Sequence, residues 1–280
     1  MLLDLSRLRS ALQNEPVGQL VDYHLSVPST MPLAHALAWQ PDGLSGLIVV
    51  AEEQTAGRGR FARRWESPAG QALLFSLILR APLAFNPAEL AIRTGLAVAL
   101  ALEAADSTLS GRVGLKWPND LLLGDPPASA GKVGGILIES AWQGNDLHHC
   151  VVGIGLNVNQ GADELPAGSP HAPTPVSLRT FLGRSEPLDR TALLVGLCRS
   201  LGERLARAGD SAAIFQGWRQ HLWTLGQAVN VLERDVQVWQ GRAIAVEADG
   251  SLVVESASGE ARRFVAGEVT VRSAGQLGPG

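Results

Sequence analysis

The sequence predicts an α/β protein in which a large mixed domain is followed by a small all-β unit. Up to about residue 222, apolar strand-like runs alternate with Ala- and Leu-rich stretches typical of helices. After Trp223 the chain changes to short alternating strands separated by polar turns. With 280 residues, it is long enough for one large and one small domain. We expect a domain at 1–222, a β unit at 223–275 and a frayed tail at 276–280.

Hydrophobic spacing and turn residues place the elements of both parts. The expected helices span residues 1–13, 30–39, 87–106, 188–208 and 211–222. The expected strands span 46–51, 72–79, 113–117, 120–123, 133–139 and 149–158, then 227–232, 236–246, 251–255 and 261–265. The pair Ser29-Thr30 precedes the second helix, and a helix N-cap is its simplest role. Residues 160–176, rich in Pro, Gly and Ala, are predicted to be a loop.

Bulk composition excludes several classes of protein. A formal net charge of −4 provides no overall basic field for nucleic acid. Asp4 comes early and no long apolar region follows it, so we expect no signal peptide. The apolar stretch near Leu96–Leu102 is too short to span a bilayer. Two cysteines make no disulfide framework, so the predicted location is a reducing cytoplasm.

Arginines are concentrated in the segment 54–60 (QTAGRGR), which is followed by RRW at 63–65. Pro68 and nearby glycine make a helix after residue 60 unfavourable. A mobile loop with several guanidinium groups suits closure over an anion. The GRG at 57–59 superficially matches a dinucleotide fingerprint, but no glycine-opened helix follows it, so a Rossmann site is not supported.

A second motif, KWPND at 116–120, lies between two predicted strands. Pro118 stiffens the turn, so Asn119 and Asp120 project from a defined place. A carboxylate beside a lysine can orient a metal, a phosphate or an amine nucleophile, whereas the alternative is a plain Pro-Asn-Asp turn. Of 23 Lys and Arg residues only Lys116 and Lys132 are lysine, which directs attention to these two compact cations.

Glycines recur in two further strand-like segments, GKVGGILIE at 131–139 and GIGLN at 153–157. Glycine inside a strand often marks close approach of a ligand, which would put Lys132 at the lip of a pocket floored by bare backbone. Asn157 can both donate and accept, as recognition of a base edge requires. The alternatives are a bulge with a solvated lysine in the first segment and a strand crowded by a packed helix in the second.

The joint order of these motifs resembles that of the biotin–protein ligases. The matching segments are ST at 29–30, QTAGRGR at 54–60, KWPND at 116–120, GKVGGIL at 131–137 and GIGLN at 153–157. The resemblance runs from about residue 28 to 160, and GEVTVRS at 267–273 is similar to that family's final β domain. It implies a mixed sheet related to class II aminoacyl-tRNA synthetases, followed by an SH3-like barrel.

The resemblance implies a two-step acyl transfer that uses ATP and Mg²⁺, with biotin as substrate. Biotin's carboxylate attacks the α-phosphate of ATP, giving biotinyl-5′-AMP and pyrophosphate. A lysine amine of a biotin carboxyl carrier protein then attacks the mixed anhydride. We expect no DNA or membrane partner, and homodimerisation is left open.

Residue roles carried over from the family form three groups, and no metal ligand is assigned. The biotin contacts would be Ser29, Thr30, Gln54, Gly57, Arg58, Lys132, Gly134 and Gly135. The ATP or adenylate contacts would be Arg58, Arg60, Trp65, Lys116, Asn119, Asn157 and Arg272. The catalytic residues would be Arg60, Lys132 and Asp120, with Asp120 aligning the incoming amine. In these roles Trp65 packs over the adenylate, Asn157 meets adenine, and Arg272 reaches the nucleotide phosphates from the β unit.

The chain departs from the family's pattern in three places. Met31 stands where a polar residue is usual, and Phe61-Ala62 interrupts a loop that is often more basic. Fewer than 30 residues precede the first motif, too few for the winged-helix DNA-binding domain that some members carry, so no repressor activity is expected.

The alternative functions are a lipoate ligase or lipoyl transferase of the same superfamily, a nicotinamide oxidoreductase, and a non-catalytic biotin or nucleotide sensor. The joint GRGR and KWPND motifs favour biotin over lipoate.

Overall fold

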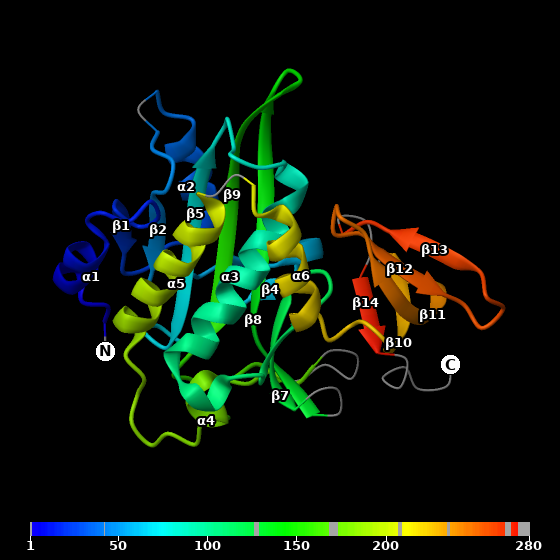
Figure 1. Cartoon of the computed structure of the whole chain (residues 1–280). Helices are drawn as coiled ribbons and strands as arrows, with labels where there is room; N and C mark the ends of the chain where they lie inside the picture. The colour runs from blue at the N-terminus through cyan, green and yellow to red at the C-terminus, as the bar shows by residue number, and fades with distance from the viewer. Residues whose placement is uncertain are drawn as a thin grey trace.

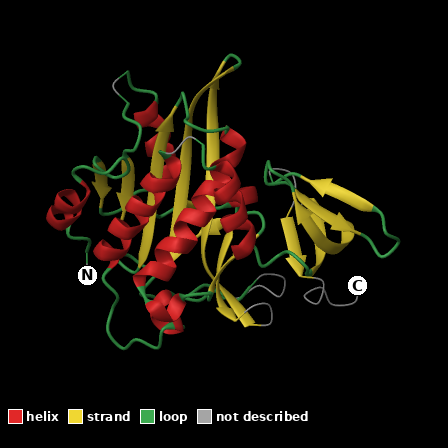
Figure 2. Cartoon of the chain, viewed as in Figure 1, coloured by secondary structure: helices red, strands yellow, loops and turns green. Residues whose placement is uncertain are grey.

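The computed structural model describes residues 2–41, 43–125, 129–167, 173–206, 209–233, 236–266 and 270–273, the last four by their backbone. Within these ranges, seven strands form a mixed sheet in the order β1-β2-β5-β9-β8-β7-β6, and five form a second sheet in the order β13-β12-β11-β10-β14. Figures 1 and 2 show the second sheet beside the helical layer of the first. In the large sheet β1 and β2 run parallel, and the other neighbouring strands run antiparallel.

The bounds of the elements of the two sheets and of the helices are as follows. The strands of the large sheet are β1 (Val21–His24), β2 (Ile48–Ala51), β5 (Ala72–Arg80), β6 (Val113–Lys116), β7 (Asp120–Asp125), β8 (Ser129–Gln143) and β9 (Asp146–Asn157). The α-helices are α1 (Leu5–Leu12), α2 (Thr30–Ala38), α3 (Leu90–Ala105), α4 (Leu178–Phe181), α5 (Arg190–Leu205) and α6 (Ser211–His221). The second sheet contains β10 (Ala228–Glu233), β11 (Val236–Val246), β12 (Leu252–Glu255), β13 (Ala261–Phe264) and β14 (Thr270–Ser273).

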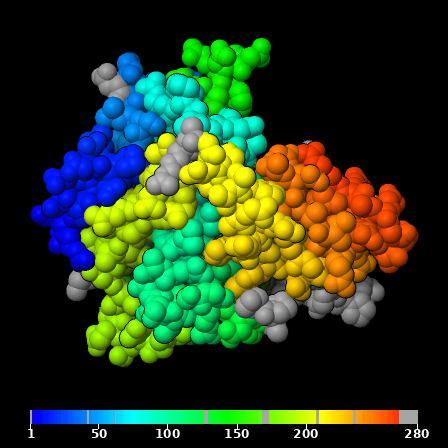
Figure 3. All heavy atoms as spheres, in the orientation of Figure 1, coloured from blue at the N-terminus to red at the C-terminus, as the bar shows by residue number. Residues whose placement is uncertain are grey.

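The alternation of side chains along a strand gives the large sheet two different faces. On one face Leu77 and Val152 join the main core, beneath α3, α5 and α6. Figure 3 shows this covered face, with the C-terminal unit beside α6. On the other face Ile78 and Val151 join a smaller core under α2. Each fully buried side chain of this kind contributes roughly 1.5–3 kcal/mol, so the larger core dominates stability.

The predicted helices and strands are confirmed, with end residues that differ by a few positions. The segment at 57–65, read as a loop, is instead a small hairpin in which β3 (Gly57–Arg58) pairs with β4 (Arg64–Trp65) across a 3₁₀ turn at Arg60–Ala62. A Cβ on Gly57 would lie 2.3 Å from the Trp65 carbonyl oxygen, so glycine permits this pairing.

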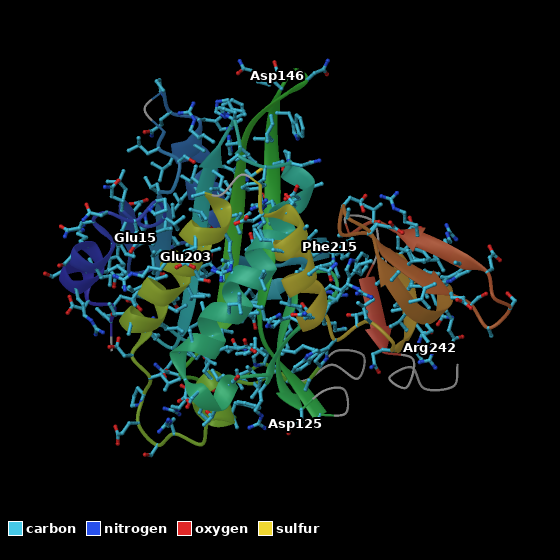
Figure 4. The ribbon with its side chains drawn as sticks, viewed as in Figure 1. Glu15, Asp125, Asp146, Glu203, Phe215 and Arg242 are labelled. Atoms are coloured by element: carbon cyan, nitrogen blue, oxygen red, sulfur yellow. The ribbon has the colours of Figure 1, made fainter. Side chains whose placement is uncertain are left out.

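Several features extend beyond the sequence-based expectations. The structure adds β1, α4 and β14, and two short 3₁₀ turns at Pro87–Glu89 and Ser107–Leu109. The β8–β9 hairpin projects past the rest of the sheet, and Figure 4 labels Asp146 at its tip. Cys150 and Cys198 are both free and buried. In the described part of the chain, no helix is long and apolar enough to cross a bilayer. The expected frayed tail at 276–280 lies outside the described residues.

Candidate active site

A cavity of about 520 Å³ opens on the α2 side of the large sheet. Its floor is the middle of β8 and β9, where Gly135, Gly153 and Gly155 carry no side chains. A Cβ on Gly155 would lie 2.8 Å from the Trp65 ring, and one on Gly153 would lie 2.6 Å from the Met31 sulfur. Glycine therefore permits close approach of the hairpin at one point and, as the alternative reading held, of a helix at the other.

The first wall of the cavity is the N-terminus of α2. The Gln54 Oε1 atom accepts from the Thr30 backbone N–H at 2.7 Å and from the Thr30 hydroxyl at 3.1 Å. The Thr30 hydroxyl also lies 2.7 Å from the Ser76 hydroxyl, so the orientation of this corner is determined by a network. Ser29 occupies the N-cap position, yet its hydroxyl makes no capping bond.

The Ser29 hydroxyl is buried and has no hydrogen-bond partner among the described residues. An unsatisfied buried hydroxyl costs roughly 1–3 kcal/mol. Because Ser29 also lines the cavity, this group suits a polar atom of a ligand. The simple N-cap interpretation therefore does not account for Ser29.

The second wall contains an ion pair. Lys132 Nζ lies 2.6 Å from Asp120 Oδ1, and the two side chains are 29% and 20% exposed. The same ammonium lies 5.9 Å from the centre of the Trp65 ring, within cation–π range. Lys132 is therefore held between a carboxylate and an aromatic face and is not a solvated lysine. The bulge of that alternative is present, as a register shift in the β7–β8 pairing between Leu121 and Leu122.

The turn that carries Asp120 is fixed by its neighbours. The Asn119 amide donates from Nδ2 to the Ile136 carbonyl at 2.9 Å, while its Oδ1 accepts from Arg60 at 3.3 Å. Asn119 thus binds β8 and the hairpin instead of closing its own turn. Arg60 also donates to the Ala266 carbonyl, which belongs to the C-terminal unit.

Electrostatics at Arg60 reflect this partly buried position. Burial lowers the pKa of Arg60, the Asp120 carboxylate opposes that shift, and Arg63 adds to it. A guanidinium remains protonated in proteins even so. Arg60 thus supplies a permanent, partly desolvated positive charge beside Asp120, where electrostatic interactions are stronger than in bulk water.

The C-terminal unit also anchors the KWPND turn, through Trp117. The backbone N–H of Trp117 donates to the Thr224 hydroxyl at 2.8 Å, and its indole N–H donates to the Gly250 carbonyl at 2.9 Å. Close by, the Trp223 ring occupies the space in which Gly114 would carry a Cβ, 2.0 Å from the nearest ring atom. Sequence reasoning missed Thr224, although glycine inside a predicted strand at 114 was an available signal.

Most of the predicted site residues line this one cavity. They are Ser29, Thr30, Gln54, Arg58, Arg60, Trp65, Lys116, Asn119, Asp120, Lys132 and Gly135. Gly57 is buried within the hairpin next to Arg58. Met31, the departure noted above, is also part of the cavity wall.

Gly134 and Asn157 do not line the cavity, and the structure does not describe the Arg272 side chain. A Cβ on Gly134 would lie 2.5 Å from the Leu156 side chain, so this glycine serves packing on β9. Asn157 is buried, donates to the Val176 carbonyl at 3.2 Å and accepts from Gln160 at 3.0 Å. Its amide therefore secures the 160–176 segment, and its position does not support contact with adenine. The backbone of Arg272 pairs with Asn230, and its side chain lies outside the described atoms.

Comparisons with known proteins agree on one family. The Biotin/lipoate A/B protein ligase family profile matches residues 25–157, and the Biotin protein ligase C terminal domain profile matches 224–272. The chain is 32% identical over 259 residues to the bifunctional ligase/repressor BirA of Bacillus spizizenii, covering 91% of this chain and 75% of that protein.

For two further similar proteins, the match covers most of the length of each. The biotin–[acetyl-CoA-carboxylase] ligase of Paracoccus denitrificans is 34% identical over 229 residues, covering 81% of this chain and 91% of that protein. The structure is similar to the biotin protein ligase of Aquifex aeolicus in complex with biotin and ATP. For that pair the TM-score is 0.70 at 26% identity, over 91% of this chain and 100% of the other.

Proposed function

The chain belongs to the biotin–protein ligase family, and we propose that it activates biotin with ATP and transfers it to a lysine of a biotin carboxyl carrier protein. The single observation that carries this proposal is the glycine-floored cavity, which gathers the Ser29–Gln54 corner, the hairpin arginines and the Lys132–Asp120 pair. The lipoate alternative is not favoured, because the similar relatives and structures are biotin ligases.

In the first step, the carboxylate of biotin attacks the α-phosphate of ATP and pyrophosphate leaves. Arg60 and Lys132 supply positive charge to the anionic reactants, and this charge matters most as the negative charge redistributes in the transition state. The Ser29 hydroxyl and the Thr30–Gln54 network are suited to hold the polar ring of biotin. We propose that Gly57 and the Arg58 backbone contact biotin and that Trp65 packs over the adenylate.

In the second step, the acceptor amine attacks the acyl carbon and AMP leaves. The ion pair suggests an exchange of partners: Lys132 turns toward the adenylate phosphate, and Asp120 is left to receive the incoming ammonium or its proton. Closure of the hairpin would exclude water, which would otherwise hydrolyse the mixed anhydride. We propose that Lys116 and Asn119, which line the cavity, support the nucleotide.

The residues fit a magnesium ion that arrives with ATP. Asp120 is the one carboxylate among the described residues that line the cavity, and Mg²⁺ in nucleotide sites typically takes one or two carboxylates with phosphates and water. When bound, the ion neutralises phosphate charge. No group of three or more His, Cys, Asp or Glu suited to a metal occurs among the described residues.

We propose the finer features of architecture and location on the same grounds. The large sheet would belong to the class II synthetase type, with residues 1–222 as catalytic domain and 223–275 as an SH3-like barrel. Arg272 would reach the nucleotide from that barrel. The two buried free thiols agree with a reducing cytoplasm.

The decisive experiment is mass spectrometry of a biotin-carrier domain after incubation with this chain, biotin and MgATP. The expected result is one added biotin on one lysine, with pyrophosphate released. A carrier with Arg in place of the acceptor lysine should stay unmodified, and lipoate in place of biotin should not be transferred. Pyrophosphate release without carrier labelling would mark adenylation alone. The absence of both products would refute the proposal.

A further inference from the structure

A chain of three histidines lies on the same sheet face as the cavity. His149 of β9 is fully buried, and strand alternation puts its side chain on the same face of β9 as the cavity-floor glycines. Its Nε2 lies 2.8 Å from His35 Nδ1, and its Nδ1 lies 2.8 Å from His148 Nδ1. His148 is partly exposed and stacks on Trp39 with ring centres 4.0 Å apart. The imidazoles therefore connect the surface to α2.

The chain ends at a carboxylate that also touches the arginine hairpin. His35 Nε2 lies 3.1 Å from Glu139 Oε2, and the other oxygen of Glu139 lies 3.7 Å from Arg58 Nη2. Glu139 belongs to β8 and Arg58 to β3. A single side chain thus links the sheet, through one oxygen each, to the histidine chain and to the hairpin.

We propose that Glu139 is a positioning residue that anchors Arg58, and with it the Gly57–Arg58 backbone, against the sheet, and that His35 orients Glu139 for this contact. His35 donates a hydrogen bond to one oxygen of Glu139 and so orients the carboxylate, whose other oxygen faces Arg58. The effect on biotin rests on the proposed function, whereas the anchoring of the hairpin does not.

The charged groups around the chain are few and come from several strands. Glu139 of β8 and Arg58 of β3 have been described, and Arg80 of β5 adds positive charge near His149. Burial first, and then the charges of His35, His148 and Arg80, lower the pKa of His149 to about 4. An imidazole with an ordinary pKa changes charge near physiological pH. Because its pKa is lowered, His149 stays neutral there.

A double-mutant cycle tests the anchor, using Glu139→Gln, Arg58→Gln and the double variant. Trypsin cutting after Arg63 and Arg64, followed by mass spectrometry without ligand, reports on the hairpin. Because the ion pair is half-exposed, we expect each single variant to be cut about two- to fivefold faster than the wild type. The double variant should be cut no faster than either single variant. Glu66→Gln, an exposed carboxylate of the same segment, should cut like the wild type. Additive single effects would overturn the proposal.

Biotin affinity and a His35 variant supply the second readout. Calorimetry should show biotin Kd about two- to fivefold higher for Glu139→Gln than for the wild type. His35→Leu removes the donor to Glu139 and should speed trypsin cutting about twofold. Cutting of His35→Leu at the wild-type rate would remove the role of His35. If the wild type bound no biotin, the proposed function would fail, yet the trypsin cycle would still decide the anchor.

Discussion

Two segments meet at the cavity, and they are held in opposite ways. The KWPND turn is anchored on both sides: Trp117 is 2% exposed and donates two hydrogen bonds to the C-terminal unit, while Asn119 donates to β8. The arginine hairpin has exposed side chains at Arg58 and Arg64, and its sheet consists of two residue pairs. One segment is built into the core, and the other lies on the surface.

This difference matches two different chemical demands. In the proposed mechanism Asp120 must lie at a fixed distance from a reacting amine, and small misplacements of catalytic groups are costly. In the same mechanism the hairpin admits substrate and then excludes water, which requires a segment of low local stability. Lys132 lies between the two, paired to Asp120 and facing Trp65.

The largest expected effect comes from removing the cation between the two segments. Lys132→Ala should slow adenylation about tenfold to over a hundredfold, since one charge-assisted contact is worth roughly 1.5–3 kcal/mol. Lys132→Arg should also slow adenylation, because a planar guanidinium does not replace a compact ammonium. Pyrophosphate release measures both, with the exposed pair variant Arg112→Ala as a control expected to be neutral. Full activity in Lys132→Arg would mean that any cation suffices here.

Acid should destabilise the fold through the buried histidine of the chain that ends at the hairpin. The folded-state pKa of His149, about 4, lies below the ordinary 6.5, so the unfolded chain binds more protons between these values. The free energy of unfolding should therefore fall by about 2 kcal/mol from pH 7 to pH 5 on account of this residue.

Urea unfolding at the two pH values measures this loss. In His149→Gln the contribution should vanish, whereas the control His24→Gln, at a partly exposed histidine paired with Asp22, should keep the wild-type difference. An unchanged pH difference in His149→Gln would show that the acid sensitivity arises elsewhere.

The anchored turn is tested by Thr224→Val, which keeps the shape of the side chain and removes the acceptor of the Trp117 N–H. A buried donor left without a partner should cost about 1–3 kcal/mol of stability. We expect kcat to fall while KM for biotin changes little, because the Ser29–Gln54 corner is separate. Steady-state kinetics and a thermal melt measure the two effects, with Thr174→Val as an exposed control. A raised KM for biotin with unchanged kcat would contradict this assignment.

The smallest expected effect is a several-fold change in the hairpin itself. Protease cutting at 58–64 should fall when biotin and MgATP are added together, since binding to the closed form stabilises it by mass action. ATP alone serves as the comparison and should protect less. Equal cutting with and without both substrates would argue against closure, and the hairpin would then be a static wall.

Sequence by itself determined the α/β class, most elements and most members of the site. Local signals sufficed for these, because strand and helix periods, Gly-rich segments and Pro118 act within a few residues. The motif order also pointed to biotin ligation, and the comparisons confirm that family. The β3–β4 hairpin was missed because its pairing depends on the opposite strand more than on its own residues.

Only the tertiary structure decided which residues face the cavity and what they touch. Gly134 and Gly135 are neighbours, yet strand alternation sends one to Leu156 and the other to the cavity floor. The anchor from Thr224 to Trp117 and the link from His149 to Arg58 join residues that lie far apart along the chain. Such contacts leave no spacing pattern in a sequence, because they depend on how whole elements pack against one another.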